Sequence, residues 1–191
     1  DRRRGPRRVD LPHRVRGVRA HWLRQPRLRL SQQNLQCPLC RRRAALRAAR
    51  FGKKLALGFS SENSHRIVDM SMCEILHPAL FALVAPLRDL LHPMVGDRRA
   101  AQIRMTLTDQ GVDLCLENVG AEGLEIAERL TAFAEEHGLA RLSIDEGFGP
   151  QTRYEPEPVT VSFGGVPVAA PPIAFLQATP EGEAALVGAA L

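Results

Sequence analysis

Cysteine carries the widest range of chemistry in this chain, and Cys37 and Cys40 have the two-residue separation of a metal-binding pair. A structural zinc ion needs four ligands. The next cysteine, Cys73, lies far downstream, and no second Cys-x-x-Cys pair or closely spaced histidine pair completes a set. The pair is therefore either part of a metal site or two free thiols in a basic loop. We expect Cys115 to face outward or lie at a sheet edge, without a chemical role.

Three consecutive arginines, Arg41, Arg42 and Arg43, follow this pair. Their charge suits contact with the phosphate backbone of RNA. The alternative is a solvated surface, which is the usual setting of a run of charges. The sequence has no P-loop, no glycine-rich dinucleotide fingerprint and no recognisable Ser-His-Asp or Cys-His set, so it indicates none of those chemistries.

Charge is divided unequally along the 191 residues. Residues 1–50 contain 16 Arg, no Lys and two Asp, a net charge of +14, whereas residues 51–191 carry a net charge of −9. Such asymmetry is typical of a basic nucleic-acid-binding arm on an acidic domain. Arg without Lys also results when GC-rich DNA is read in a wrong frame, and both interpretations stay open for residues 1–36.

Composition also bounds the location. No apolar run approaches the roughly 20 residues that span a bilayer, and the Arg-rich start lacks the apolar stretch of a signal peptide. The cysteine spacing does not suggest a secreted disulfide framework. We therefore expect a cytoplasmic protein that contacts no membrane, and nothing predicts a protein partner.

Apolar periodicity predicts the helices that would position these groups. Residues 77–94 place leucine and valine at three- and four-residue steps, which predicts an amphipathic helix kinked at Pro86. Residues 122–140 predict a second amphipathic helix that stops at Gly138. These are the two main helices of the expected fold.

Alternation of apolar and polar residues predicts the strands. Residues 101–119 predict a hairpin with its turn at residues 109–111, and residues 158–172 predict another that turns at residues 164 and 165. Shorter strands are predicted over residues 53–59, 65–70 and 141–145, with residues 41–51 as a strand or short helix and residues 147–158 as a loop. Without strict βαβ alternation, the pattern favours an α+β fold with a mixed, largely antiparallel sheet.

A strand-to-helix junction is predicted near the C-terminus. Residues 174–177 read as the end of a strand, and a helix follows, with Thr179 as its cap and Pro180 at the first helical position. Free backbone N–H groups point outward at such a junction, which makes it a common place for a ligand.

From Arg41 to Leu191 the order of motifs resembles one family, the S-adenosylmethionine-dependent RNA uracil-C5 methyltransferases, and above all the bacterial enzymes that methylate uridine in 23S ribosomal RNA. The matching stretches are RRRAALRAAR…LALGF, SHRIVDMSMCEILHPAL, MTLTDQGVDL and AFLQATPEGEAAL. Family members have an N-terminal RNA-binding barrel, a central domain with an iron–sulfur cluster and a C-terminal Rossmann-like catalytic domain. The resemblance implies an Arg-rich segment (1–40), a central α+β domain (41–172) and the first strand and helix of a truncated Rossmann-like domain (173–191).

The resemblance also implies roles for single residues. Phe175 and Gln177 match a Phe-x-Gln motif in which the aromatic ring lies near the RNA and the glutamine helps to hold the methyl donor, S-adenosylmethionine. Cys73 matches the last of four cysteines that bind a 4Fe-4S cluster, although the family's upstream run of three cysteines is absent. No catalytic residue is assigned: the attacking cysteine and the carboxylate base are expected beyond Leu191. We therefore expect a fragment that is inactive alone; the alternative is a stand-alone RNA-binding α+β protein with an Arg-rich arm.

Overall fold

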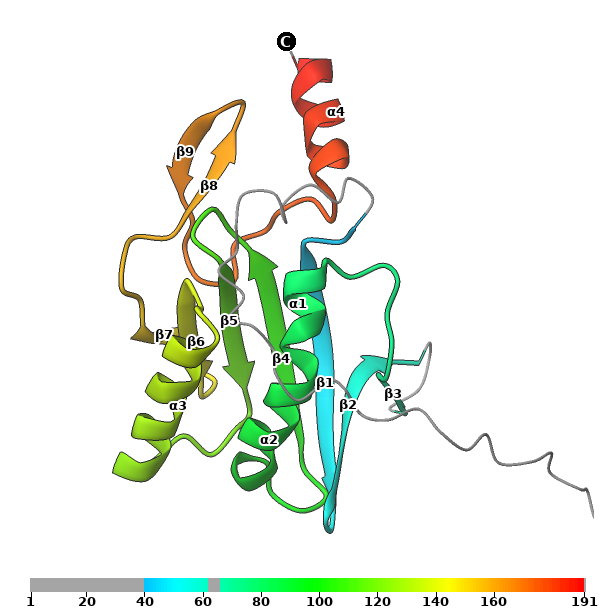
Figure 1. The fold of residues 1–191 in the computed structure, drawn as a ribbon, viewed down its shortest axis with the longest axis vertical. Helices are drawn as coiled ribbons and strands as arrows, with labels where there is room; N and C mark the ends of the chain where they lie inside the picture. The colour runs from blue at the N-terminus through cyan, green and yellow to red at the C-terminus, as the bar shows by residue number, and fades with distance from the viewer. Residues whose placement is uncertain (1–39, 62–65, 191) are drawn as a thin grey trace, which may run out of the picture.

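The computed structural model describes residues 40–61 and 66–190 (Figure 1). Within that part the fold is α+β, as the sequence predicts: a seven-stranded sheet, helices on one of its faces, a separate two-stranded hairpin and a final helix. The interpretations given to residues 1–36, and nearly all of the expected Arg-rich segment 1–40, fall outside the described residues.

The large sheet has the strand order β3-β2-β1-β4-β5-β6-β7. Neighbouring strands are antiparallel except β5 and β6, which are parallel because α3 forms the crossover between them. The strands are β1 (Arg43–Phe51), β2 (Lys54–Ser60), β3 (Ile67–Asp69), β4 (Ala100–Leu107), β5 (Val112–Glu117), β6 (Arg141–Asp145) and β7 (Pro150–Tyr154). The sheet is thus mixed and largely antiparallel, and residues 41–51 resolve as a strand.

Three helices pack on one face of this sheet: α1 (Pro78–Ala82), α2 (Val84–Met94) and α3 (Leu124–Glu136) (Figure 1). The single helix expected over residues 77–94 is divided at Leu83, not kinked at Pro86. Pro86 lies in the first turn of α2, where a missing backbone N–H leaves no intrahelical bond unmade. The predicted end of α3 is confirmed, since His137 caps it and Gly138 follows with a positive φ of 59°.

The core forms where the helices meet the sheet. Every second side chain of the central strands points toward the helices, and these side chains are buried against the apolar faces of α1, α2 and α3. Its largest members include Ile103, Met105, Leu114, Leu116, Leu142, Ile144, Leu80, Leu87 and Leu91. This alternation is what made the hairpin β4–β5 and the strand β6 predictable.

Cys115 differs from its prediction. It is only 2% exposed, in β5, between β4 and β6 in the interior of the sheet. The expectation of an outward or edge position was wrong because five of the six β5 residues, on both faces, are buried. The β5 sequence alternates, but because the strand is covered on both sides, its polar positions are buried as well, and the alternation marks no exposed face.

The C-terminal third contains two further corrections. Residues 150–154 form β7 inside the segment expected to be a loop, and residues 170–178 contain no strand although a strand end was expected there. The hairpin β8 (Thr160–Phe163) and β9 (Val166–Ala169) is confirmed, with Gly164 and Gly165 at positive φ in its turn. The last helix, α4 (Pro180–Ala190), projects beside this hairpin from the same end of the large sheet (Figure 1).

Candidate functional site

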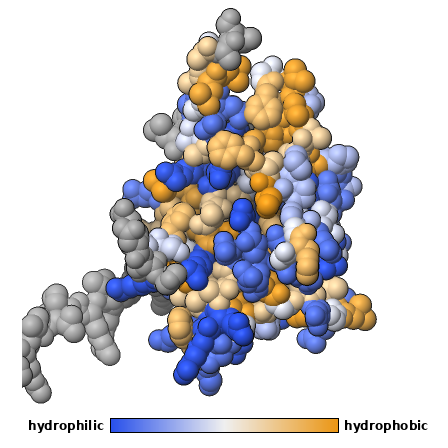
Figure 2. Space-filling view, turned by 180° about the vertical axis from the view of Figure 1, so that it is seen from behind, coloured by the Kyte–Doolittle hydropathy of each residue, from blue (hydrophilic) through white to orange (hydrophobic). Residues whose placement is uncertain are grey.

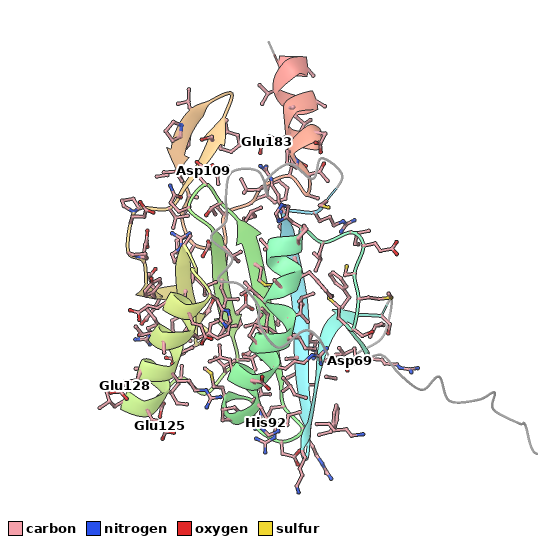
Figure 3. All side chains as sticks on the ribbon, in the orientation of Figure 1. Asp69, His92, Asp109, Glu125, Glu128 and Glu183 are labelled. Carbon is pink, nitrogen blue, oxygen red and sulfur yellow. The ribbon has the colours of Figure 1, made fainter. Side chains whose placement is uncertain are left out.

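Arg42, immediately before β1, holds the chain at the entrance to α4. Its backbone N–H donates to the carbonyl of Ala178 over 2.9 Å, and its Nε donates to the carbonyl of Gln177 over 3.2 Å. Its guanidinium also forms an ion pair with Glu183 in the first turns of α4 (Figure 3). The two side chains are 11% and 15% exposed. Arg42, expected to face RNA, therefore uses its charge in an internal contact with a residue 141 positions away in the sequence, which no local pattern predicts.

Arg43 supports the neighbouring aromatic residue. Its guanidinium donates to the carbonyl of Leu176 over 2.8 Å, and its central carbon lies 4.8 Å from the centre of the Phe175 ring. This is a cation–π contact. Leu176 is buried, whereas Phe175 is 74% exposed. The chain is thus fixed directly after an aromatic ring that contacts Arg43 and is otherwise largely exposed to solvent.

Gln177 lies between this ring and the start of α4. Its backbone carbonyl accepts from Arg42, while its half-buried side-chain amide makes no hydrogen bond within the described part of the chain. Thr179 caps α4 as predicted: its Oγ1 accepts from the N–H of Gly182 over 3.2 Å. The amide of Gln177 is therefore placed beside a helix N-terminus with its donor and acceptor available for a ligand.

Arg41 extends the same end of the sheet. Its N–H donates to the carbonyl of Ile75 over 2.7 Å, and its own carbonyl accepts from the N–H of His77 over 3.0 Å. The residue is exposed. Of the three arginines expected to meet RNA, Arg41 presents its side chain to solvent, Arg43 supports Phe175 and Arg42 is enclosed.

A cavity of about 170 Å³ lies behind this junction. Its wall combines the β4–β5 turn, the β8 strand and the first residue of α4, and it is lined by residues that include Arg42, Thr108, Asp109, Ser162 and Pro180. The carboxylate of Asp109 accepts from the Oγ and the N–H of Ser162, over 2.9 and 3.2 Å, and so ties the hairpin to the sheet (Figure 3). The cavity is smaller than the roughly 300–1,000 Å³ of most ligand pockets, so it cannot enclose a whole methyl donor.

The described cysteines do not fit an iron–sulfur cluster. Such clusters need thiolates that converge, four in the usual case. Cys40 is in a disulfide, Cys73 is a half-buried free thiol packed against the core, and Cys115 is buried in β5. Burial, with help from the nearby carboxylates of Glu117 and Asp113, raises the pKa of Cys115 to about 12. In residues 40–61 and 66–190 no three His, Cys, Asp or Glu side chains are arranged to hold a metal ion, and Cys37 lies outside that part.

Arg88 fixes the segment that leads to Cys73. Its guanidinium donates to the carbonyls of Leu57 and Met70 and forms an ion pair with Asp69, with the Arg88–Met70 contact at 2.6 Å. The pKa of Asp69 is lowered from its usual value. Partial burial alone would raise this pKa, but hydrogen bonds from the Leu57 N–H and from Arg88, together with the positive charge of Arg88, have the larger combined effect. This carboxylate is therefore a structural anion.

Known proteins similar to the chain are RNA methyltransferases. A protein of Zymomonas mobilis named as an RNA methyltransferase is 50% identical over 158 residues, which are 83% of this chain and 40% of that protein. One of Brucella suis is 38% identical over 149 residues, covering 76% of the chain and 34% of the relative. No family model matches the chain. The chain with this α+β fold is thus similar to part of proteins named as RNA methyltransferases.

The more specific family follows from a third relative. The 23S rRNA (uracil(1939)-C(5))-methyltransferase RlmD of Edwardsiella ictaluri is 32% identical over 152 residues, 76% of this chain and 34% of that enzyme. The chain belongs to the RNA uracil-C5 methyltransferase family. It spans between about one third and two fifths of the length of these three relatives. No helix in the described residues is both long and apolar enough to cross a membrane.

Proposed function

We propose that this chain is the central part of an S-adenosylmethionine-dependent 23S rRNA uracil-C5 methyltransferase. In this proposal residues 41–172 form the central domain, and residues 173–191 begin the Rossmann-like catalytic domain. The observation that carries it is the fixed junction at Phe175 and Gln177, in a chain that is similar to RNA methyltransferases.

Phe175 would contact the RNA. An exposed aromatic ring stacks well on an unpaired base, and the guanidinium beneath its inner face adds electrostatic support. Leu176 is buried and Arg43 holds its carbonyl, so the ring is already positioned before RNA arrives. Arg41, exposed on the same side of the junction, would contact phosphate.

Gln177 would help to hold the methyl donor. S-adenosylmethionine supplies the methyl group, and its amino-acid end carries a carboxylate and an ammonium group. An amide can donate to the first and accept from the second. The adjacent N-terminus of α4 adds positive potential toward the carboxylate. Arg42 would be a positioning residue, because its bond to the Gln177 carbonyl sets the direction of the side chain.

The chemical step would need groups outside this chain. Addition of a thiolate to C6 of uracil makes C5 nucleophilic. Cys115 cannot supply that thiolate, because its pKa of about 12 keeps it protonated and it is enclosed in the sheet. We therefore place the nucleophile and the carboxylate base in the part of the relatives that this chain does not span, and expect the chain alone to be inactive.

The test is to disrupt the reading frame in the strain that encodes it and to measure 5-methyluridine in 23S rRNA by mass spectrometry. Loss of one modified uridine supports the proposal. Unchanged 5-methyluridine would refute it and would favour the stand-alone RNA-binding alternative. The purified chain with labelled S-adenosylmethionine and rRNA should show no turnover, with a Cys73→Ser variant as the background control.

A further inference from the structure

Two turns are joined at the end of the sheet far from Phe175. The β1–β2 turn and the loop from α2 to β4 lie side by side there (Figure 1). The N–H of Arg98 donates to the carbonyl of Arg50 over 2.9 Å, and the N–H of Gly52 donates to the carboxylate of Asp97 over 2.7 Å. The guanidinium of Arg50 also bonds the carbonyls of Gly52 and His92. Both turns are therefore held in one rigid unit.

This unit concentrates positive charge. Lys53, Lys54, Arg98 and Arg99, which we call the basic end, are all exposed. Among the described residues none of the four forms an ion pair. They are four of the ten basic residues in the segment 51–191, whose net charge is −9. The carboxylate of Asp97, the acidic residue between the turns, accepts a hydrogen bond from the N–H of Gly52. The basic end is therefore a positively charged surface on a segment whose net charge is negative.

An aromatic ring accompanies these cations. Phe51, at the end of β1, is 65% exposed and precedes Lys53 in the same turn. A hydrophobic ring of this size is not needed to close a turn, which Gly52 does with its positive φ of 60°. The back view shows a strongly hydrophilic surface at this lower end of the molecule (Figure 2).

We propose that the basic end is a second RNA contact, in which Lys53, Lys54, Arg98 and Arg99 bind consecutive phosphates and Phe51 stacks on an unpaired base. Exposed cations without ion pairs bind phosphate without first breaking a protein contact, and interleaved aromatic rings are typical of single-strand binding. The rigid pairing of the turns reduces the entropy that binding would otherwise cost. The inference rests on the proposed function, which makes RNA the substrate.

The experiment compares charge-neutralised variants of the whole 191-residue chain. Fluorescence anisotropy with a labelled single-stranded, uridine-containing RNA is recorded over a series of KCl concentrations for Lys53→Gln/Lys54→Gln and Arg98→Gln/Arg99→Gln. Arg129→Gln/Arg153→Gln removes the same charge from exposed positions on α3 and β7 and is the matched control. Circular dichroism checks that every variant is folded.

For each pair at the basic end, the slope of log K against log salt should fall by about 1.4, and affinity in about 0.1 M salt by roughly 25-fold. Phe51→Leu, which keeps an apolar side chain but cannot stack, should weaken binding about fivefold or more. The control pair should change the slope by much less.

The outcomes separate the two proposals. If the slope of log K against log salt is the same for the two basic-end pairs and the control pair, the basic end is not an RNA contact. This result would leave the proposed function standing. Wild-type protein that binds no RNA overturns both. Affinity for anionic vesicles that exceeds affinity for RNA overturns the assignment of RNA as the partner of this surface.

Discussion

Replacement of Arg42 by alanine should release α4 from the rest of the molecule. The change removes the ion pair with Glu183 and the hydrogen bond to the Gln177 carbonyl. Hydrogen bonds to a charged group contribute roughly 1.5–3 kcal/mol each, but this pair keeps some contact with water. We take about 2–3 kcal/mol as the cost of losing both.

The size of that cost matters because α4 has little else to hold it. Nearly all its side chains are exposed, and an 11-residue helix is marginal in water by itself. At 1.4 kcal/mol per factor of ten, amide hydrogen exchange in α4 should become about 30- to 140-fold faster in Arg42→Ala. Exchange in β4 and β5 should not change, since those strands open only with the whole domain.

Mass-spectrometric hydrogen exchange measures this directly. Arg129→Ala is the control, because Arg129 donates to the carbonyl of Asp89 over 2.9 Å and lies on α3, away from α4. A double-mutant cycle with Glu183→Ala should give a coupling of about 1 kcal/mol or more. If α4 exchanges at the wild-type rate in Arg42→Ala, the ion pair does not anchor the helix and our account of the junction is refuted.

Three further predictions concern the domain itself. Asp113→Ala should lower the free energy of unfolding in urea by about 3 kcal/mol, because it leaves the buried charge of Arg141, which is 3% exposed, with only a 3.8 Å ion pair to Glu155. A loss below about 1 kcal/mol would contradict this. Because the pKa of Asp69 is lowered, its carboxylate stabilises the fold above about pH 4 and loses that effect as pH falls through the folded pKa. Asp69→Asn should therefore destabilise the protein at about pH 7 and by less at about pH 3, and an equal difference at both would argue against it. In the native protein at about pH 8, iodoacetamide should modify Cys73 and spare Cys115, whose pKa is about 12, as peptide mapping would show; rapid labelling of Cys115 would mean that β5 is accessible.

Local patterns made part of this fold predictable. Residues 141–145 were identified as a strand with the bounds they have in β6, and the turn at Gly164 and Gly165 was placed correctly. In both, the signal lies in adjacent residues: apolar alternation in one and glycine backbone freedom in the other. Strand β7 is not predictable from local pattern, because residues 151–153 are exposed and follow a glycine-rich turn, so only pairing with β6 makes this segment a strand.

The junction shows what local patterns omit. Thr179 as a helix cap was predictable, since a cap bonds residues within one turn. The contacts of Arg42 and Arg43 with residues 176–183 join parts of the chain more than 130 residues apart. The side chains of Arg42 and Arg43 donate to backbone carbonyls in this segment, where a strand over residues 174–177 would have used hydrogen bonds to a neighbouring strand. Apolar periodicity in the sequence does not predict such side-chain contacts.

Strand β1 sets a fixed distance across the molecule. It begins at Arg43 and ends at Phe51, and eight steps of about 3.3 Å give roughly 26 Å. It lies between β2 and β4, hydrogen-bonded on both sides, so neither end can shift without the other. A nucleic acid that contacts both aromatic rings would therefore need two contact points at a spacing set by the length of β1. A target with a different spacing would contact only one of the rings.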